Sequence, residues 1–295
     1  VPAQGPARQA VTAASDGVAS GMEMPASRAI HAQLRGVTRV FPLASGAGLH
    51  ALGPIDLDLY HGEFFAVVGP SGCGKSTLLD VLAGLSPPSE GTATFEGKAI
   101  DGVPDGVGVV FQEDASFPWL TVRDNVAFGL RRAGVDEAEI RKRVDYAIGF
   151  MGLRDFERAY PAQLSGGMRQ RVCIARTLVL QPRLILLDEP FGALDQQTRL
   201  LMGDELLRLW RETSATVLLI THALDEANLL SDRIGVMSAR PGRFIDVVET
   251  GWPQDRDSRL AERPDFGAVT SRLWSLLRSE SMRAMGQGGP GGGRA

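Results

Sequence analysis

Hydrophobic residues along this chain gather in short runs separated by polar and glycine-rich turns, and the spacing within each run predicts a strand or a helix. Short apolar runs bounded by turn residues predict strands at 36–41, 55–60, 64–68, 92–95, 107–111, 184–187, 216–221 and 233–237. The runs at 184–187 and 216–220 are apolar on both faces, which is typical of central strands in a parallel sheet.

Longer segments carry apolar residues at helical spacing and predict helices at 75–83, 122–133, 136–151, 166–180, 196–213 and 223–230. Because strands and helices alternate, the pattern indicates an α/β domain with a doubly wound sheet. The stretch from 121 to about 180 is purely helical and predicts a subdomain beside that sheet. A polar stretch after residue 248 precedes one more predicted helix, at 266–277.

The two ends of the chain differ in composition from the part between them. Residues 1–28 are mainly small or polar and residues 281–295 are rich in glycine, so neither segment buries enough apolar surface to offset the entropy of ordering. We therefore predict disordered tails at 1–28 and 281–295, one domain at 29–250 with its helical subdomain at about 121–180, and a helical extension at 251–280.

Composition narrows the function classes. The formal charge of −4 gives no basic excess for a phosphate backbone, so nucleic acid is not an expected partner. The two cysteines, Cys73 and Cys173, form no metal-ligand pair, and a reducing compartment is the simple interpretation. No run approaches the ~18 apolar residues of a membrane span, and the N-terminus lacks the features of a secretory signal. Any role at a membrane is therefore expected to depend on partners.

The strand predicted at 64–68 leads into a phosphate-binding loop and then a helix, with the sequence Gly69-Pro70-Ser71-Gly72-Cys73-Gly74-Lys75-Ser76-Thr77. Its glycines let backbone N–H groups point at phosphate oxygens, and the helix N-terminus adds positive charge. We expect Lys75 to reach the β- and γ-phosphates, Ser76 to ligate Mg²⁺ and Thr77 to donate to a phosphate oxygen. The alternative is a glycine-rich turn that binds nothing, but the complete motif in this setting argues against it.

The strand at 184–187 ends in two adjacent carboxylates, Asp188 and Glu189. Because side chains alternate along a strand, the two acids are suited to different tasks. Asp188 is a candidate for the Mg²⁺ shell, and Glu189 for accepting a proton from the water that attacks the γ-phosphate. Taken alone, such a pair is as often a solvated turn; behind a phosphate-binding loop the catalytic interpretation is favoured.

A second candidate anion site lies at the start of the helix predicted at 166–180. Ser165 is a good N-cap, and two glycines expose N–H groups at the positive end of this helix. A capped helix without a ligand is the alternative. One nucleotide bound between two copies of the chain would use both this site and the phosphate-binding loop.

With these motifs in order, the sequence resembles the ATP-binding cassette (ABC) transporter family. Four further segments match that family: Val110-Phe111-Gln112-Glu113 resembles its Q-loop, 164–168 its signature, Ala193-Leu194-Asp195 its D-loop, and Thr221-His222 its switch histidine. The resemblance implies a P-loop NTPase fold with a RecA-like mixed sheet, an antiparallel β subdomain and a helical subdomain. It also implies ATP and Mg²⁺ as cofactors.

The resemblance implies a role for each matched residue. Gln112 would sense the γ-phosphate and Mg²⁺ and join Ser76 and Asp188 around the metal. Asp195 would bridge a dimer interface, and His222 would hold the attacking water in line for catalysis. The signature residues would close over the γ-phosphate of ATP held by the second copy: Leu164, Ser165, Gly166, Gly167 and Met168.

Three residues are less certain in their role. Phe41 stands where the family has an aromatic that stacks on adenine, with a core aromatic as the alternative. Met168 departs from the glutamine that the family most often has there; methionine cannot donate a hydrogen bond, yet the serine and glycine contacts remain, so activity is expected to survive. Cys73 lies inside the phosphate-binding loop, and oxidant sensitivity there is a weak hypothesis.

A cluster of large apolar residues in a proline-broken segment, Phe117, Trp119 and Leu120, predicts a partner surface. In the family this region meets the cytoplasmic helices of a permease; a folded-in subdomain core is the alternative. The segments 109–130, 225–227 and 238–243 look most like the branch that imports nitrate, sulfonates or taurine.

The expected function is therefore that of the ATP-hydrolysing subunit of an importer, working as a homodimer on the cytoplasmic face of the inner membrane with separate permease subunits. A periplasmic or lipid-anchored solute-binding protein would be an indirect partner. The alternatives are an importer ATPase for another small solute, such as a thiamine precursor, and a soluble ABC ATPase without a transport role. The short span between Gln112 and Ser165 leaves no room for the coiled coil that such soluble ATPases carry.

Overall fold

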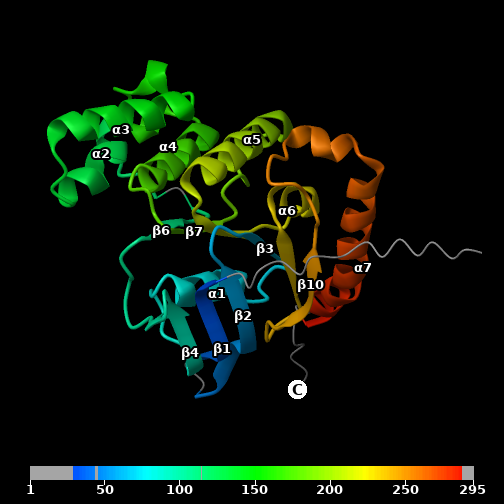
Figure 1. Ribbon diagram of the computed structural model, residues 1–295. Helices are drawn as coiled ribbons and strands as arrows, with labels where there is room; N and C mark the ends of the chain where they lie inside the picture. Colours follow the sequence, from blue (N-terminus) through cyan, green and yellow to red (C-terminus); the bar gives the residue numbers. More distant parts are fainter. Residues whose placement is uncertain (1–28, 44–45, 114, 288–295) are drawn as a thin grey trace, which may run out of the picture.

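The computed structural model describes residues 29–43, 46–113 and 115–287 (Figure 1). The predicted tail at 1–28 and residues 288–295 of the predicted C-terminal tail lie outside the described residues. Within the described part of the chain, no helix has both the length and the apolar content to cross a bilayer.

A six-stranded mixed sheet forms the centre of the molecule. Its strand order is β10 (Phe244–Glu249), β9 (Arg233–Met237), β3 (Phe64–Val68), β8 (Thr216–Ile220), β7 (Leu184–Asp188) and β6 (Val107–Val110). Neighbouring strands from β9 to β6 are parallel, and β10 pairs antiparallel with β9. The predicted α/β class with a mixed core sheet is confirmed, whereas β10 was not predicted.

A four-stranded antiparallel sheet lies below the central sheet in Figure 1, in the order β2 (Gly48–Tyr60), β1 (Ile30–Pro42), β4 (Glu90–Phe95) and β5 (Lys98–Ala99). The first two strands are longer than predicted, because β1 and β2 pair along their whole length, from Ile30 opposite Tyr60 to Pro42 opposite Gly48. Backbone hydrogen bonds continue beyond the apolar positions of each strand, and the hydrophobic pattern of the sequence does not predict that extension. The two-residue strand β5 was also not predicted.

Ten helical segments connect the strands in the described residues. They are α1 (Lys75–Leu82), α2 (Val122–Arg132), α3 (Glu137–Phe150), α4 (Gly166–Leu178), α5 (Gln196–Thr213), α6 (Leu224–Leu230) and α7 (Pro264–Gln287), with short 3₁₀ turns η1 (Arg154–Phe156), η2 (Pro161–Gln163) and η3 (Ser258–Glu262). Helices α2 and α3 stand apart from the central sheet, as Figure 1 shows, and α4 joins them to β6.

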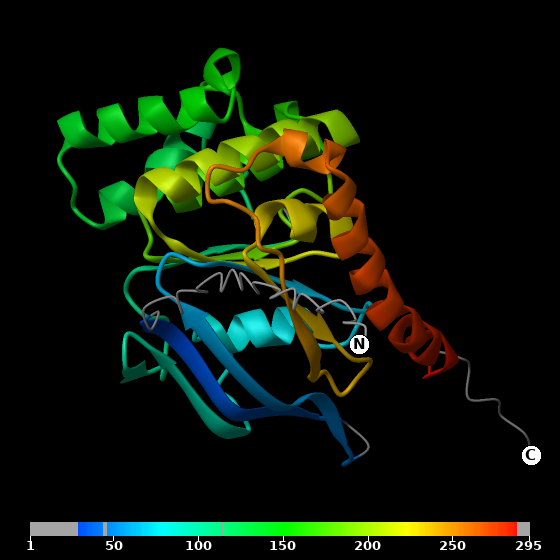
Figure 2. The same ribbon diagram turned by 45° about the vertical axis from the view of Figure 1, so that its right-hand side comes forward.

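Alternating side chains of β3 divide the interior into two cores. Phe65 and Val67 pack with α1 and the antiparallel sheet, so α1 lies between the two sheets (Figure 2). Phe64 and Ala66 point the other way, into the core formed with α4, α5, α6 and α7. A strand buried on both faces has apolar side chains at successive positions, and this explains the continuous apolar runs in the sequence.

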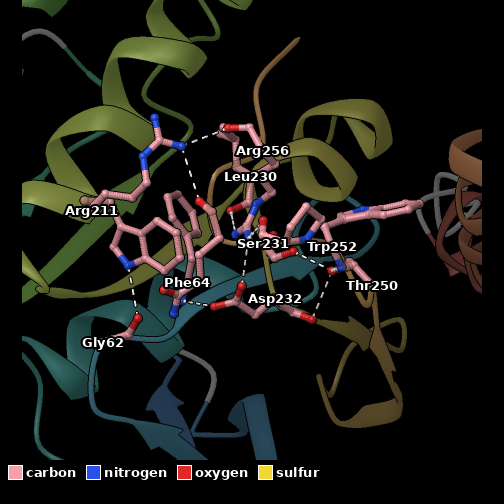
Figure 3. A network of polar contacts seen from close by, with 12 residues as sticks. Gly62, Phe64, Arg211, Leu230, Ser231, Asp232, Thr250, Trp252 and Arg256 are labelled. Carbon is pink, nitrogen blue, oxygen red and sulfur yellow. Dashed lines mark hydrogen bonds and ion pairs between the residues drawn. The ribbon is translucent and has the colours of Figure 1, made fainter. Parts of the chain in front are cut away.

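A buried arginine fastens the C-terminal extension to the central sheet (Figure 3). The side chain of Arg256 is fully buried and donates to the carbonyl oxygens of Leu229 at 3.1 Å and Leu230 at 2.6 Å, and to Asp232 at 2.8 Å. Asp232 in turn accepts a hydrogen bond from the Phe64 amide at 2.9 Å. Burial lowers the pKa of Arg256, opposed by the Asp232 carboxylate. The extension is thus held by a paired and hydrogen-bonded charge, the form in which a buried charge is tolerated.

Helix α7 runs along one side of the molecule and extends beyond the predicted 266–277 at its C-terminal end. Its later turns carry few apolar residues, so hydrophobic spacing gave no signal there. Glu280 anchors this part instead, because its carboxylate accepts a hydrogen bond from the Ala239 amide at 2.9 Å. The helix therefore reaches back to the loop between β9 and β10.

Candidate functional site

The candidate site lies at the edge of the central sheet where the parallel strands end. The phosphate-binding loop follows β3, Gln112 follows β6, Asp188 closes β7 and His222 follows β8. Because parallel strands present their carboxyl ends at one edge, residues far apart in sequence meet there. This topology is what assembles the site.

The phosphate-binding loop curls tightly before α1. Gly74 has φ 109°, and a Cβ there would lie 2.7 Å from the Ala51 carbonyl oxygen, so only glycine fits. No side chain caps the N-terminus of α1, which leaves the first-turn N–H groups and the positive helix end for an anion. Lys75 is buried and its Nζ donates to the carbonyls of Gly69 at 2.9 Å and Pro70 at 3.1 Å, so its charge is held at the loop.

Asp188 is buried beside the helix that follows the loop. Burial raises the pKa of its carboxyl, with the neighbouring Glu189 charge adding to the effect, while a hydrogen bond from Ser76 lowers it. Its Oδ1 is buried without a hydrogen-bond partner. An acidic oxygen that is buried and unpaired in this way suits a cation ligand.

Two of the predicted catalytic residues, His222 and Gln112, meet at one carboxylate oxygen of the third, Glu189. Oε2 of Glu189 lies 3.2 Å from Nδ1 of His222 and 3.3 Å from Nε2 of Gln112. Glu189 also adopts a left-handed backbone with φ 46°, a conformation that few non-glycine residues hold. The structure thus brings together three residues that the sequence could name but not place.

A cavity of 380 Å³ opens over the loop and is lined by Phe41, Leu49, Ala51, Ser71, Gly72, Gly74, Lys75, Ser76, Thr77, Gln112, Glu189 and Arg240. Phe41 is half-buried at this cavity, with the Arg39 guanidinium 4.6 Å from its ring centroid, so it does not lie in a hydrophobic core. The lining runs from aromatic and aliphatic side chains to the phosphate loop, which suits a nucleotide.

Arg240 belongs to this cavity and was missed as a site residue. Arg240 lies in the segment 238–243, which resembles the family, but the residue pattern alone does not indicate a contact with the cavity. Gly242 of the same loop packs so closely on the phosphate loop that a Cβ would collide with the Cys73 carbonyl oxygen. This close approach holds the loop of Arg240 at the mouth of the cavity.

The signature residues lie away from this cavity. Among the described residues that line it, none comes from 164–168. The Ser165 hydroxyl accepts a hydrogen bond from the Met168 amide at 3.3 Å and caps α4, and both Ser165 and Gly166 are exposed. The Met168 side chain packs against the core, so it does not extend the exposed helix tip.

Asp195 caps α5 and lies beside the signature. Its carboxylate accepts hydrogen bonds from the amide and hydroxyl of Thr198 at 2.9 and 2.6 Å, and these bonds lower its pKa. A Cβ on Gly167 would lie 2.7 Å from Cδ2 of Leu194, so the two exposed motifs are neighbours on one surface.

Cys73 lies inside the phosphate-binding loop with its side chain buried. Burial raises the pKa of its thiol, with Lys75 opposing the effect. A buried, protonated thiol is a poor nucleophile, which argues against the weak hypothesis of oxidant sensitivity.

Comparison with known proteins identifies this arrangement. The ABC transporter family model matches residues 52–192. The chain is 46% identical over 252 residues to the taurine import ATP-binding protein of Pelagibacter ubique, covering 84% of this chain and 95% of that one. It is 40% identical over 255 residues to the nitrate import ATP-binding protein of Synechocystis sp., covering 84% and 96%.

The chain belongs to the ABC transporter family of ATP-binding proteins. The resemblance inferred from the motifs, including that to the nitrate and taurine branch, is confirmed. A solved ATP-binding cassette, a dimer in a post-hydrolysis state with ADP and Pi, matches with a TM-score of 0.69 and 31% identity over 75% of this chain and all of its own. This ABC protein is thus an ATP-binding and ATP-hydrolysing subunit.

We predict that Arg240→Ala raises the KM for ATP roughly five- to tenfold, because the variant loses about one charge-assisted contact. The kcat should stay within about twofold of the wild-type value. The physical reason is that Arg240 lines this cavity but is not among the three residues that meet at Oε2 of Glu189. Steady-state ATPase assays of the purified chain measure both constants. Arg243→Ala is the matched control, since Arg243 is exposed on the same loop and does not line the cavity. Equal KM values for the two variants would show that Arg240 does not contact ATP.

Proposed function

We propose that two copies of this chain bind two ATP molecules between them and drive a separate membrane permease. The observation that carries the proposal is the separation of the two anion sites: the cavity holds the phosphate loop, while the helix tip at Ser165 is exposed and outside the cavity lining. A single chain leaves the γ-phosphate side of its nucleotide open. A second copy presenting Ser165, Gly166 and Gly167 would close it, with Asp195 at the interface.

The residues at the phosphate loop fit Mg²⁺. Asp188 offers a buried oxygen without a partner, Ser76 lies within hydrogen-bonding reach of that carboxylate, and Gln112 lines the same cavity. Oxygen donors of this kind, completed by phosphate oxygens, are what Mg²⁺ prefers in nucleotide sites. When bound, the ion would neutralise charge on the transferred phosphoryl group.

In the proposed mechanism the chain supplies position and charge. The curled amides of 69–75 and the Lys75 ammonium stabilise negative charge on the phosphates. Glu189 accepts the proton of the attacking water, and His222 and Gln112 hold its carboxylate in place through their contacts with Oε2. Because all three residues come from strand ends of one rigid sheet, they are positioned before ATP arrives.

An exposed aromatic patch on the helical subdomain supports a permease-docking role. Trp119 is 70% exposed, and the Phe117 ring lies 5.6 Å from the Trp119 ring and 4.7 Å from that of Phe128, which is also exposed. The buried side chain of Asn125 fixes the loop by accepting from the Phe117 amide at 2.8 Å and donating to the Leu120 carbonyl at 3.0 Å. A rigid, exposed aromatic surface is typical of a protein-binding site.

The relatives suggest the cargo and the location. Since the named relatives are taurine and nitrate import ATP-binding proteins, we propose uptake of nitrate, sulfonate or taurine-like solutes, with the chain on the cytoplasmic face of the inner membrane. A periplasmic or lipid-anchored solute-binding protein would deliver the solute. A different small solute, such as a thiamine precursor, is the second candidate, because the cargo does not contact this chain.

We predict that Glu189→Gln lowers ATP turnover by about 10²-fold or more while ATP still binds, because the amide cannot accept the proton of water. Turnover and nucleotide binding are measured separately, by phosphate release and by a fluorescent ATP analogue. Glu249→Gln, an exposed position at the end of β10, is the control and should match the wild type. Near-wild-type turnover in Glu189→Gln would remove this residue from the mechanism.

We further predict that Trp119→Ala weakens association with the permease at least tenfold, the cost of removing a central interface aromatic, without changing the ATP affinity of the isolated chain. Co-purification from membranes that contain the permease measures the association. Trp274→Ala is the matched control, since Trp274 is 57% exposed on α7, away from this patch. If both variants bind the permease equally well, the aromatic patch is not the docking site.

A further inference from the structure

A second cavity, of 310 Å³, lies behind the catalytic edge among α5, α6, η3 and α7. Most of its lining is apolar, including Phe191, Leu229 and Phe266. Three charged residues line it: Arg199 from α5, and Asp225 and Glu226 from α6. Two of these residues have a buried polar atom without a hydrogen-bond partner: Nε of Arg199 and Oε1 of Glu226.

Arg199 is tied to the D-loop. Its Nη2 donates to the Leu194 carbonyl at 3.1 Å, and its own amide donates to the Asp195 carbonyl at 2.9 Å. Arg199 therefore contacts both Leu194, which packs on the signature, and Asp195, which is proposed to bridge the dimer. Any displacement of the D-loop by a second copy would move the Arg199 guanidinium.

Glu226 is tied to the switch-histidine loop. Its carboxylate receives a hydrogen bond from the Thr221 hydroxyl, which also accepts from the Ala223 amide at 3.1 Å. These two bonds bracket His222, which lies between Thr221 and Ala223 and contacts Glu189. The position of the Glu226 carboxylate is therefore coupled to that of the switch histidine.

We propose that Arg199 and Glu226 form a charged link that couples the D-loop to the switch-histidine loop, so that closure by a second copy positions His222 against Glu189. Both are positioning residues and neither touches the nucleotide cavity. Opposite charges attract across this mostly apolar cavity, and Arg199 favours the charged form of the Glu226 carboxyl. The inference rests on the proposed roles of Asp195 and His222.

The ionisation of Glu226 gives the proposed link a measurable pH dependence. Burial raises the pKa of this carboxyl to about 7, and the Glu189 charge adds to the rise, while Arg199 and the Thr221 hydroxyl oppose it. Asp225 on the same helix is exposed and receives a hydrogen bond from Thr270 of α7. From η3 and α7 the cavity receives only Ala261 and Phe266, which carry no charge. The link requires the carboxylate, so it should be present above pH 7 and lost as the pH falls below it.

A double-mutant cycle on the full-length chain tests the link. Arg199→Gln and Glu226→Gln should each lower kcat about tenfold with ATP KM within about twofold, as expected for two residues that act as a unit. The double variant should also lose about tenfold. A loss of about a hundredfold in the double variant, or no loss in either single variant, overturns the proposal.

The pH profile separates positioning from a structural defect. The kcat ratio of wild type to Glu226→Gln should fall from about tenfold at pH 8 to about twofold at pH 6, as the wild-type carboxyl takes up a proton. A ratio that stays constant over this range contradicts the link. Arg199→Gln should give the same convergence with wild type, so the proposal remains testable if Glu226→Gln does not fold.

Two controls make the outcome specific. Glu205→Gln removes a carboxylate from the same helix as Arg199, where it pairs with Arg208 at 3.0 Å, and should retain wild-type turnover at every pH. Glu189→Gln, assayed alongside, tests the proposed catalytic role itself. If Glu189→Gln turns over normally, the proposed mechanism fails; if Glu189→Gln is inactive and the cycle is additive, only the link fails.

Discussion

The structure depends on one constraint: a polyanionic phosphate chain must be held at the edge of an apolar sheet. The central strands β3, β7 and β8 bury both faces and are apolar between their first and last residues, so the charged groups of the site lie where a strand ends. Backbone amides, the N-terminus of α1 and Lys75 provide the positive charge there. The same edge gathers Asp188, Glu189 and His222, so the proposed binding and catalytic residues lie in one place.

Sequence patterns were sufficient for the parts that depend on local chemistry. The phosphate-binding loop, the acidic pair after β7 and the capped helix at Ser165 need particular residue types at fixed spacing, and each was predicted with its surrounding strand or helix. Apolar runs likewise located five of the six strands of the central sheet, all but β10. What they could not give was distance, such as the convergence of Gln112 and His222 on one oxygen of Glu189.

The elements that sequence analysis missed share a physical cause, since tertiary contacts rather than local pattern create them. Strand β10 exists because β9 offers it an edge, and the polar end of α7 is held by Glu280. Arg240 lies at the nucleotide cavity because its loop is held in place by the close approach of Gly242 to the phosphate loop. The placement of Arg199 and Glu226 at one cavity also cannot be read from sequence spacing, because the two residues come from different helices.

These features describe a subunit that is incomplete alone. The nucleotide cavity, the exposed signature tip and the D-loop are each formed, but in one chain the tip lies outside the cavity lining. The most direct test is sedimentation of Glu189→Gln with ATP and Mg²⁺, with a variant that also carries Ser165→Arg as the control. The account predicts a dimer only for the chain with an intact signature; a strictly monomeric Glu189→Gln chain, both alone and with its permease, would contradict it.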